Sequence, residues 1–455
     1  MTHNRFRLTG MQKFSLIWFG QLISLVGTAT TRFALLVWAY EKTGQATTTA
    51  LLGFFSYILY VLVSPFAGVV IDRLDRRVVM ILADLGAGLM TLSLFLLYSN
   101  GNLQIWHLYV AEALTGAFEA FQLPSFSAAT TMLVPKEQYG RVSGMRSLAL
   151  AASQVFAPAF AGIILHIVGI SGVMLIDVAT FVLGVIPLIF IMIPRPQVKT
   201  TEKTAPSKGW RDILFGFHYI AQRPGLLGLM LIFCGINLSA ALTWYAILPP
   251  MILGRTGGDS LALATVQSAM GIGGVIGGIA MSIWGGPKRR IHGVLLLGGI
   301  SFLSSDFLLG VGHVTAVWAF AAFAGSLYIP FIVGCDLAIW QAKVPPEVQG
   351  RVFSVQTLLQ QFTMPLGYLL AGPLADRVLE PAMMPGGALA NTFGWLVGTG
   401  PGAGMGLMFI GTFILGSSIC FGGYLFPAVR NVEKDLPDHD HIVESRPGIP
   451  AAETV

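Results

Sequence analysis

Long apolar stretches without a single charged side chain recur along the whole sequence. Eight of them cover Phe14–Thr31, Thr43–Ile71, Leu85–Ala111, Ser147–Ile176, Pro224–Gly254, Ser260–Pro287, Phe307–Cys335 and Pro381–Val429. About 20 apolar residues form a helix long enough to cross the hydrocarbon core of a bilayer. The pattern therefore predicts membrane-spanning helices.

We place twelve such helices and predict an all-α polytopic membrane protein. The predicted spans are residues 14–40, 48–71, 78–99, 104–133, 142–167, 171–193, 225–251, 261–284, 291–311, 315–342, 351–373 and 402–428. The apolar stretch of the first span runs on to about Tyr40, so we expect a retained helix rather than a cleaved signal peptide. An even number of spans puts both chain ends on the same side of the membrane.

The composition supports this class and excludes a soluble enzyme. Apolar residues make up 54% of the chain and charged residues 11%, against roughly 25% charged residues in an ordinary soluble domain. Cys234, Cys335 and Cys420 lie far apart within apolar stretches, a spacing that suits neither a disulfide framework nor a metal site. We expect no cofactor and no metal.

The positive charges indicate the orientation. With the N-terminus inside, 23 of the 27 lysines and arginines fall on the inner side, and only Arg32, Lys42, Arg255 and Arg377 fall on the outer side. Cytoplasmic loops of membrane proteins carry such an excess of positive charge. We predict a protein of the cytoplasmic membrane with both termini in the cytoplasm. The same distribution explains the basic pI without a nucleic-acid partner.

The predicted organisation is two six-helix bundles, residues 1–193 and 225–429, with a cytoplasmic linker at 194–224 and a polar tail at 430–455. In the linker, Trp210, Ile213, Leu214 and Phe217 recur at the spacing of a helix that lies in the membrane interface.

A short internal repeat relates the two halves. Residues 134–142 recur as residues 344–352, with six of nine positions identical at an offset of 210 residues. Both copies fall on the predicted inner side, after spans four and ten. Two parallel repeats with a binding site near the midplane between them are typical of secondary transporters.

Two motifs carry a resemblance to a known family. Between spans two and three, Gly68-x-x-x-Asp72-Arg73 is followed by Asp75, Arg76 and Arg77, which resembles the loop signature of the major facilitator superfamily, although a second glycine is usual where Asp75 stands. The second half keeps only glycine and basic residues in the corresponding loop, 285–290, without the aspartate.

Span five resembles a weakened form of the antiporter motif of the same superfamily. Its residues are Gly144, Ser153, Ala157, Pro158, Ala161 and Gly162, with Ser or Ala at three positions where the family has glycine. Small residues let helices touch, and the proline bends the span. The alternative is a kinked helix that carries no information about the direction of transport.

As a whole, residues from about Phe14 to Pro427 resemble the branch of this superfamily that includes macrolide efflux proteins and the enterobactin exporter. The resemblance implies a gating role for Gly68, Asp72, Arg73, Arg76 and Arg77, and export driven by proton exchange. It also implies that spans one and four line a central cavity.

Charged residues inside spans are costly, by about 2.5–3.5 kcal/mol on insertion scales, so each needs a partner or a function. Glu112 and Glu119 lie seven residues apart and share a face of span four. Arg32 falls at the depth of Glu112, so the two are expected to pair in the cavity. We select Glu119, Glu112, Arg32 and Asp336 as candidates for proton coupling and the substrate cavity, with Glu119 first.

Other charged residues in the spans receive structural interpretations. We expect Asp84 and Arg146 to pair with loop charges, Asp177 to be interfacial, and Asp306 to lie on a peripheral span. Seven aromatic residues are candidates for stacking on an amphiphilic substrate: Trp38, Phe118, Phe121, Trp244, Tyr245, Tyr328 and Trp340.

The function predicted is proton-coupled export of amphiphilic, macrolide-like compounds by a protein acting as a monomer. Its expected partners are the substrate, protons and the lipid bilayer. The alternatives are export of one specific metabolite such as a siderophore, nutrient uptake by symport, and a receptor or scaffold that transports nothing.

Overall fold

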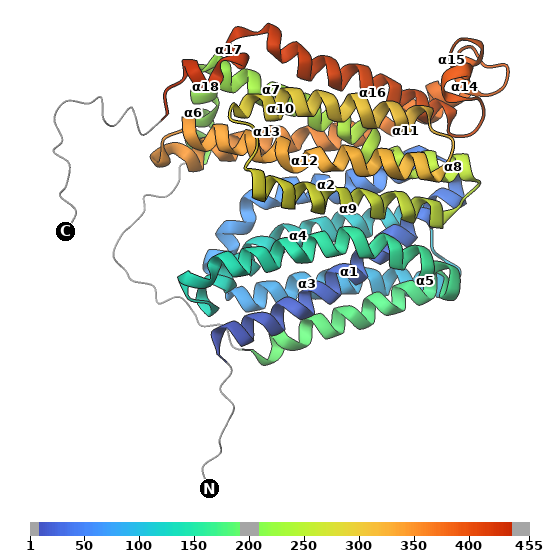
Figure 1. The fold of residues 1–455 in the computed structure, drawn as a ribbon. Coiled ribbons are helices and arrows are strands. Elements are labelled where there is room, and N and C mark those ends of the chain that lie inside the picture. Colours follow the sequence, from blue (N-terminus) through green and yellow to red (C-terminus); the bar gives the residue numbers. More distant parts are fainter. Residues whose placement is uncertain (1–8, 192–208, 439–455) are drawn as a thin grey trace, which may run out of the picture.

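The computed structural model describes residues 9–191 and 209–438 of the chain. In these ranges the backbone forms helices joined by short turns, and no strand is present. Figure 1 shows long helices that run side by side, with the first half of the chain in the lower layer and the second half in the upper layer. The all-helical fold predicted from the apolar stretches is confirmed.

The first half consists of five long helices. They are α1 (Gly10–Thr43), α2 (Ala46–Arg73), α3 (Arg76–Ser99), α4 (Ile105–Leu133) and α5 (Tyr139–Phe190), with a 3-10 turn at Lys136–Gln138 before α5. Within α5, Gly169 has φ +66° and ψ −177°, a conformation that side-chain-bearing residues rarely adopt. Gly169 divides α5 into two segments, at the place where the sequence predicted the break between membrane spans five and six.

The second half begins with α6 (Gly209–Ala221), a helix in the predicted linker. Its crossing helices are α7 (Pro224–Ala240) continued by η2 and α8 (Leu248–Thr256), α9 (Ser260–Trp284), α10 (Arg290–Ser301) continued by η3 and α11 (Phe307–Val311), α12 (Thr315–Lys343), α13 (Pro346–Pro373) and α16 (Ala403–Gly422). The π-helical turns η2 and η3 cover Ala241–Tyr245 and Phe302–Asp306. The loop after α13 holds η4 (Leu374–Leu379), α14 (Glu380–Met383) and α15 (Ala390–Val397), and η5 (Gly423–Leu425), α17 (Pro427–Arg430) and α18 (Val432–Asp435) follow α16.

Nine helices in the described residues are long and apolar enough to cross a membrane. One of them is α5, which holds two segments, and α4 and α13 supply two more long helices that are not among the nine. The architecture is therefore compatible with the twelve predicted spans. Whether α6 lies in the membrane interface stays a prediction, because Trp210 and Ile213 are outside the described side chains.

The internal repeat occupies equivalent places in the two halves. Val134 follows α4 directly and Val344 follows α12 directly, and each donates its amide to the carbonyl four residues earlier. Val134, Val142, Val344 and Val352 are all buried. The similarity in sequence thus accompanies a similarity in local structure.

Two helix pairs join the halves: α5 packs on α9, and α2 packs on α13. At the first pair, a β-carbon at Gly162 would lie 2.7 Å from that of Ala264, and Ser268 donates to the carbonyl of Val155 at 3.1 Å. At the second pair, Tyr57 donates to Gln361 at 3.0 Å. Both contacts rely on small or polar side chains that let the helices approach closely.

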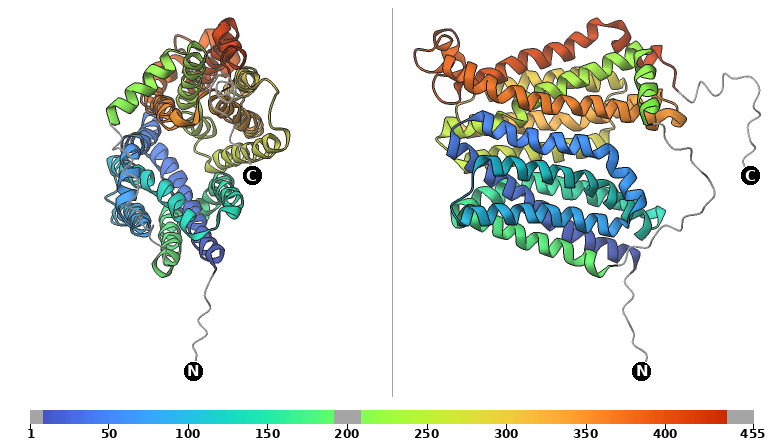
Figure 2. Two further views of the ribbon diagram at one scale, coloured as in Figure 1. Left: turned by 90° about the vertical axis from the view of Figure 1, so that its left-hand side faces the viewer. Right: turned by 180° about the vertical axis from the view of Figure 1, so that it is seen from behind.

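Asp376 makes the contact nearest the α2 N-terminus. Its carboxylate oxygens accept from the backbone amides of Ala46 at 2.9 Å and Thr47 at 2.7 Å. The N-cap residue Gln45 makes no such bond. A carboxylate from η4 in the second half therefore caps a helix of the first half and joins the two halves at the end that carries α14 and α15 (Figure 2).

This cap yields a test of how firmly that end is closed. We expect Asp376→Ala to increase hydrogen exchange of the first α2 amides by about fivefold, because removal of a helix cap costs about 1 kcal/mol. The measurement is hydrogen exchange followed by mass spectrometry on the purified full chain. Asp259→Ala is the matched control, since Asp259 caps its own helix α9 at Leu261 and Ala262. Equal exchange in α2 of both variants would contradict a joining role for Asp376.

Candidate functional site

An arginine and two glutamates meet between α1 and α4. Arg32 Nη1 lies 2.8 Å from Glu119 Oε1, and Arg32 Nε lies 3.3 Å from Glu112 Oε2. Arg32 Nη2 also donates to Ser56 of α2 at 3.4 Å. The seven-residue spacing puts both carboxylates on one face of α4, where a single guanidinium reaches both. We call Arg32, Glu112 and Glu119 the charged triad.

The pairing of Arg32 with Glu112 was expected, but the one with Glu119 was not. Sequence reasoning left Glu119 without a local partner, and the structure corrects this. The side chain of Glu119 is 33% exposed and that of Glu112 is 16% exposed. Glu119 is thus the carboxylate of the triad that is more open to a cavity.

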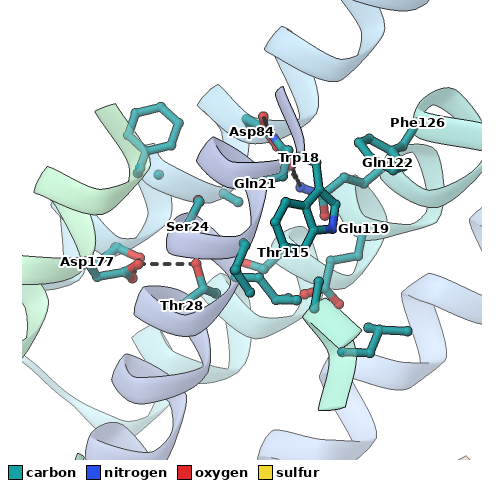
Figure 3. A pocket seen from close by; sticks show the side chains of 18 of the residues that line it. Trp18, Gln21, Ser24, Thr28, Asp84, Thr115, Glu119, Gln122, Phe126 and Asp177 are labelled. Atoms are coloured by element: carbon teal, nitrogen blue, oxygen red, sulfur yellow. Dashed lines mark hydrogen bonds between the residues drawn. The ribbon is translucent and has the colours of Figure 1, made fainter. Parts of the chain in front are cut away.

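That cavity has a volume of about 350 Å³ and lies within the first half of the chain. Most of its wall comes from α1, α3, α4 and both segments of α5, with Tyr60 from α2. Figure 3 labels ten of the side chains that line it: Trp18, Gln21, Ser24, Thr28, Asp84, Thr115, Glu119, Gln122, Phe126 and Asp177. A smaller cavity beside it is lined by Arg32 and Glu112. Spans one and four contribute to the wall of this cavity, which lies within the first half, whereas their place in a central cavity between the two bundles stays a prediction.

The aromatic wall differs from the expected one. None of the seven aromatic candidates lines the cavity; Trp18, Tyr60, Phe126 and Phe181 do. Trp244 instead donates to Asp306 at 2.6 Å, and Trp340 is fully buried. Trp38, Phe118 and Phe121 lie on α1 and α4, which border the cavity, but do not line it. The other four candidates lie in the second half, apart from this cavity.

Asp84 of α3 also faces this cavity, and the expectation that it pairs with loop charges is wrong. Its Oδ2 accepts from Gln21 Nε2 at 2.7 Å and its Oδ1 accepts from Gln122 Nε2 at 2.6 Å. Asp84 is 4% exposed. Arg146, also expected to meet loop charges, lines the cavity and donates to Ser127 at 2.9 Å.

Asp177, expected at the interface, is buried and lies across the cavity from Asp84 in Figure 3. It accepts from the hydroxyls of Thr28 at 3.2 Å and Thr91 at 3.0 Å. Threonine hydroxyls are weak signals in an apolar sequence, so this site was not visible before the helices were placed.

Asp336, the fourth candidate for proton coupling, lies apart from the triad, on α12 in the second half. It is buried and accepts from Trp340 at 3.1 Å and Gln356 at 3.2 Å. Asp306 is likewise buried in the second half, where it accepts from Trp244 and from Thr412 at 2.7 Å. Neither carboxylate lines the cavity, and the structure does not bring Asp336 together with Arg32.

The basic residues of the loop signature tie helices of the first half together. Arg76 donates to the carbonyl of Ala128 at 2.8 Å, and Arg77 donates to the carbonyls of Leu188 and Ile189 at the end of α5. Cations are favourable near the C-terminus of a helix. The side chains of Gly68, Asp72 and Arg73 lie outside those the structure describes.

In the second half, the corresponding loop leads into a helix that is capped by a residue from far along the chain. Glu433 of α18 accepts from the amides of Arg290 at 3.0 Å and Ile291 at 2.9 Å, and so caps α10. Asp75 caps α3 in the same way through Arg77 N at 3.0 Å. Sequence reasoning missed Glu433 because it is more than 140 positions away from the helix it caps.

The residues of the antiporter-like motif form part of the contact between the halves. Ser153, Ala157, Pro158, Ala161 and Gly162 are buried in α5, and Gly162 faces Ala264 of α9. A β-carbon at Gly144 would meet open space. The small residues Ser153, Ala157, Ala161 and Gly162 therefore serve helix contact.

A second cluster that sequence reasoning missed lies in the long loop after α13. Glu380 accepts from the amides of Gly402 at 3.0 Å and Met405 at 2.8 Å. Burial raises the pKa of the Glu380 carboxyl, and the amides of Met405 and Gly402 act against this rise. Arg255 donates to the carbonyls of Gly310, Gly312, Val397 and Gly402 in the same region. These bonds hold the loop at this end of the molecule.

Comparison with known proteins identifies related sequences over most of the chain. Macrolide efflux protein A of Streptococcus pyogenes is 27% identical over 371 residues, which cover 80% of this chain and 90% of that protein. The enterobactin exporter EntS of Shigella flexneri is 23% identical over 335 residues, which cover 72% of this chain and 76% of EntS.

Solved structures share the fold. A bacterial homologue of the human lysosomal transporter Spinster, in an inward-facing and unoccupied conformation, superimposes with a TM-score of 0.66 at 16% identity over 93% of this chain and 98% of that one. The nucleoside transporter NupG has a TM-score of 0.61 at 11% identity over 91% of this chain and 100% of its own. The sequence model of the Major Facilitator Superfamily matches residues 17–368. This protein therefore belongs to the Major Facilitator Superfamily, a family of membrane transporters and not of enzymes.

Proposed function

We propose that this transporter exports amphiphilic small molecules of the macrolide type in exchange for protons, by alternating access. The observation that carries the proposal is the charged triad at a cavity inside the membrane-spanning region. A carboxylate at such a place is costly and marks proton relays and substrate pathways in membrane proteins. The relatives named for macrolide efflux support the substrate class and the direction of transport.

The charges of the triad explain how proton and substrate exclude one another. Two ionised carboxylates and one guanidinium carry one net negative charge. A proton on Glu119 cancels this charge and leaves Arg32 paired with Glu112 alone. A positively charged substrate in the cavity cancels it as well, and then the proton is no longer needed. Glu119 takes the exchanging role because it is the more exposed carboxylate and lines the larger cavity.

The contacts between the halves support a cycle that opens one end at a time. The cap of Asp376 on α2 closes the end that bears α14 and α15. In the predicted orientation this is the outer end, so these contacts close the transporter towards the outside. Opening outwards breaks this cap, and we assign Gly68, Asp72, Arg73, Arg76 and Arg77 to control of the opposite end. The two moving units are the proposed bundles 1–193 and 225–429, and one chain suffices for the cycle.

Other functions remain as alternatives with their own support. The similarity to EntS favours export of one specific metabolite such as a siderophore. Nutrient symport would require the proton and the substrate to bind together, whereas the triad as described makes them exclude one another. A receptor or scaffold would leave the triad without a role.

The orientation is open to a direct test. A phosphatase that is active only outside the cytoplasm, fused after Val455, is expected to stay silent because the positive charges keep that end inside. The same reporter inserted at Gly386, in the loop after α14, serves as the positive control and is expected to be active. Strong activity at Val455 would contradict the proposed topology.

Proton coupling is tested by Glu119→Gln, which keeps the shape of the side chain but cannot exchange a proton. In inverted proteoliposomes with an acidic lumen, the wild type should accumulate erythromycin about tenfold for one pH unit and one proton, since a factor of ten equals about 1.36 kcal/mol. Glu119→Gln should bind erythromycin and equilibrate it without accumulation. Glu112→Gln should reduce the accumulation of erythromycin less than Glu119→Gln does. In the wild type the Glu112 carboxylate is more enclosed and stays paired with Arg32, so it does not exchange the proton.

Exposed Glu41, on the same helix as Arg32, provides the matched control. Glu41→Gln should accumulate erythromycin as the wild type does. Undiminished uphill transport by Glu119→Gln would remove Glu119 from the cycle and direct the search to Asp336.

A further inference from the structure

The cavity contains an ionisable group that the charged triad does not use. Asp84 lies on α3, at the wall where Gln21 of α1 and Gln122 of α4 converge on its two oxygens (Figure 3). Within the described side chains, its partners are these two neutral amides, and no lysine or arginine lies within ion-pair distance of it. The carboxylate of Asp84 is thus hydrogen-bonded but has no cationic partner among the side chains that the structure describes.

The two glutamines are oriented by this carboxylate. An ionised carboxylate only accepts hydrogen bonds, so both glutamines must turn their NH₂ groups towards it. Gln122 Nε2 also reaches Gln21 Oε1 at 3.4 Å. Gln21 Oε1 thus accepts from Gln122, and the three side chains form one connected group at the cavity wall with the carboxylate of Asp84 at its centre. A carboxylate held in this way suits a cation and disfavours an anion.

The rest of the wall suits an apolar body attached to that cation. Trp18 donates its indole N–H to the carbonyl of Met145 at 2.9 Å, which fixes the ring at the cavity wall. Phe126 and Tyr60 also line the cavity. Aromatic faces attract cations and pack well on apolar groups. The volume of about 350 Å³ lies within the range of small-molecule sites.

Other charges facing the cavity favour a cation as well. Glu119 and Asp177 add two carboxylates to the wall, and Arg146 adds one guanidinium, whose Nη1 donates to Ser127. Arg32 is turned towards Glu112 and Glu119. Carboxylates therefore outnumber guanidiniums around the space where a ligand would lie.

We propose that Asp84, held by Gln21 and Gln122, is the counter-ion for the positively charged nitrogen or phosphorus centre of an amphiphilic organic cation. The aromatic side chains Trp18 and Phe126 then hold its apolar part. This inference rests on the proposed transport function and names the substrate class of the same cavity. It separates two tasks: Asp84 selects charge, and Glu119 exchanges the proton.

The test compares two probes of similar shape, the cation tetraphenylphosphonium and the neutral triphenylphosphine oxide. Calorimetric titration of the purified full chain should show that Asp84→Asn binds the cation at least tenfold more weakly than the wild type, with little change for the neutral probe. Asp84→Glu should retain the preference for the cation. Asp306→Asn is the matched control, because Asp306 is equally buried among neutral donors but lies outside the cavity.

An unchanged ratio of the two affinities in Asp84→Asn would overturn the proposal, and so would a wild type that binds the neutral probe but not the cation. A second measurement uses only the wild type and so does not depend on the folding of a variant. A tetraphenylphosphonium derivative with a diazirine group should label peptides that contain Trp18 or Phe126. Labelling confined to the second half of the chain would overturn the assignment.

These outcomes are separable from those of the proposed function. If Glu119→Gln abolishes accumulation while Asp84→Asn leaves cation binding unchanged, the antiport proposal stands and the role of Asp84 fails. If Asp84→Asn loses the cation while Glu119→Gln still accumulates substrate, the cation site stands and the coupling residue is wrong.

Discussion

The cost of placing charge in a hydrocarbon environment governs this structure. Among the described residues, the carboxylates buried within the spans are each satisfied by side chains from other helices or from the next turn. Asp177 uses threonine hydroxyls, Asp84 uses glutamine amides, and Asp306 and Asp336 use a tryptophan together with a threonine or glutamine. Among the carboxylates in the described part of the spans, those of Glu112 and Glu119 on α4 are the ones that meet a cation, Arg32. A buried polar group without partners is expensive, so these bonds also fix how the helices are rotated.

The two halves use this constraint differently. In the second half, Asp306 and Asp336 are enclosed by their donors and stabilise helix packing. Asp306 joins η3 to α16 through Thr412, and Asp336 joins α12 to α13 through Gln356. In the first half, Asp84, Asp177 and Glu119 border a cavity, where a ligand has access to them. The repeat relates the halves in sequence, yet the chemistry suited to a substrate is concentrated in one of them. The second half then contributes the contacts of α9 and α13 that close one end.

Much of the fold could be predicted from the sequence, because membrane spans depend on local composition. The apolar stretches predicted the crossing helices, and the break around Gly169 was visible as a change between two spans. The pairing of Arg32 with Glu112 followed from depth alone. These features depend on position along a helix axis, and counting residues from the membrane surface gives that position.

The site could be predicted less well because it depends on rotation about each axis. The bonds of Asp84 to Gln21 and Gln122 join three helices, and nothing local in the sequence marks the two glutamines as its partners. The same holds for Asp177 and its threonines, and for Glu433, which caps a helix far away in sequence. The aromatic candidates on α1 and α4 failed for this reason, whereas those of the second half lie on elements that do not border the cavity.

The central claim is that a proton and a substrate compete for the negative charge of one cavity. Proton release on binding tests it most directly, with the wild-type chain in weakly buffered detergent, a pH-sensitive dye and tetraphenylphosphonium, a cation that carries no proton of its own. We expect that saturating the site releases protons, approaching one per bound cation. Saturable binding that releases no protons at any pH at which the cation binds would contradict this competition.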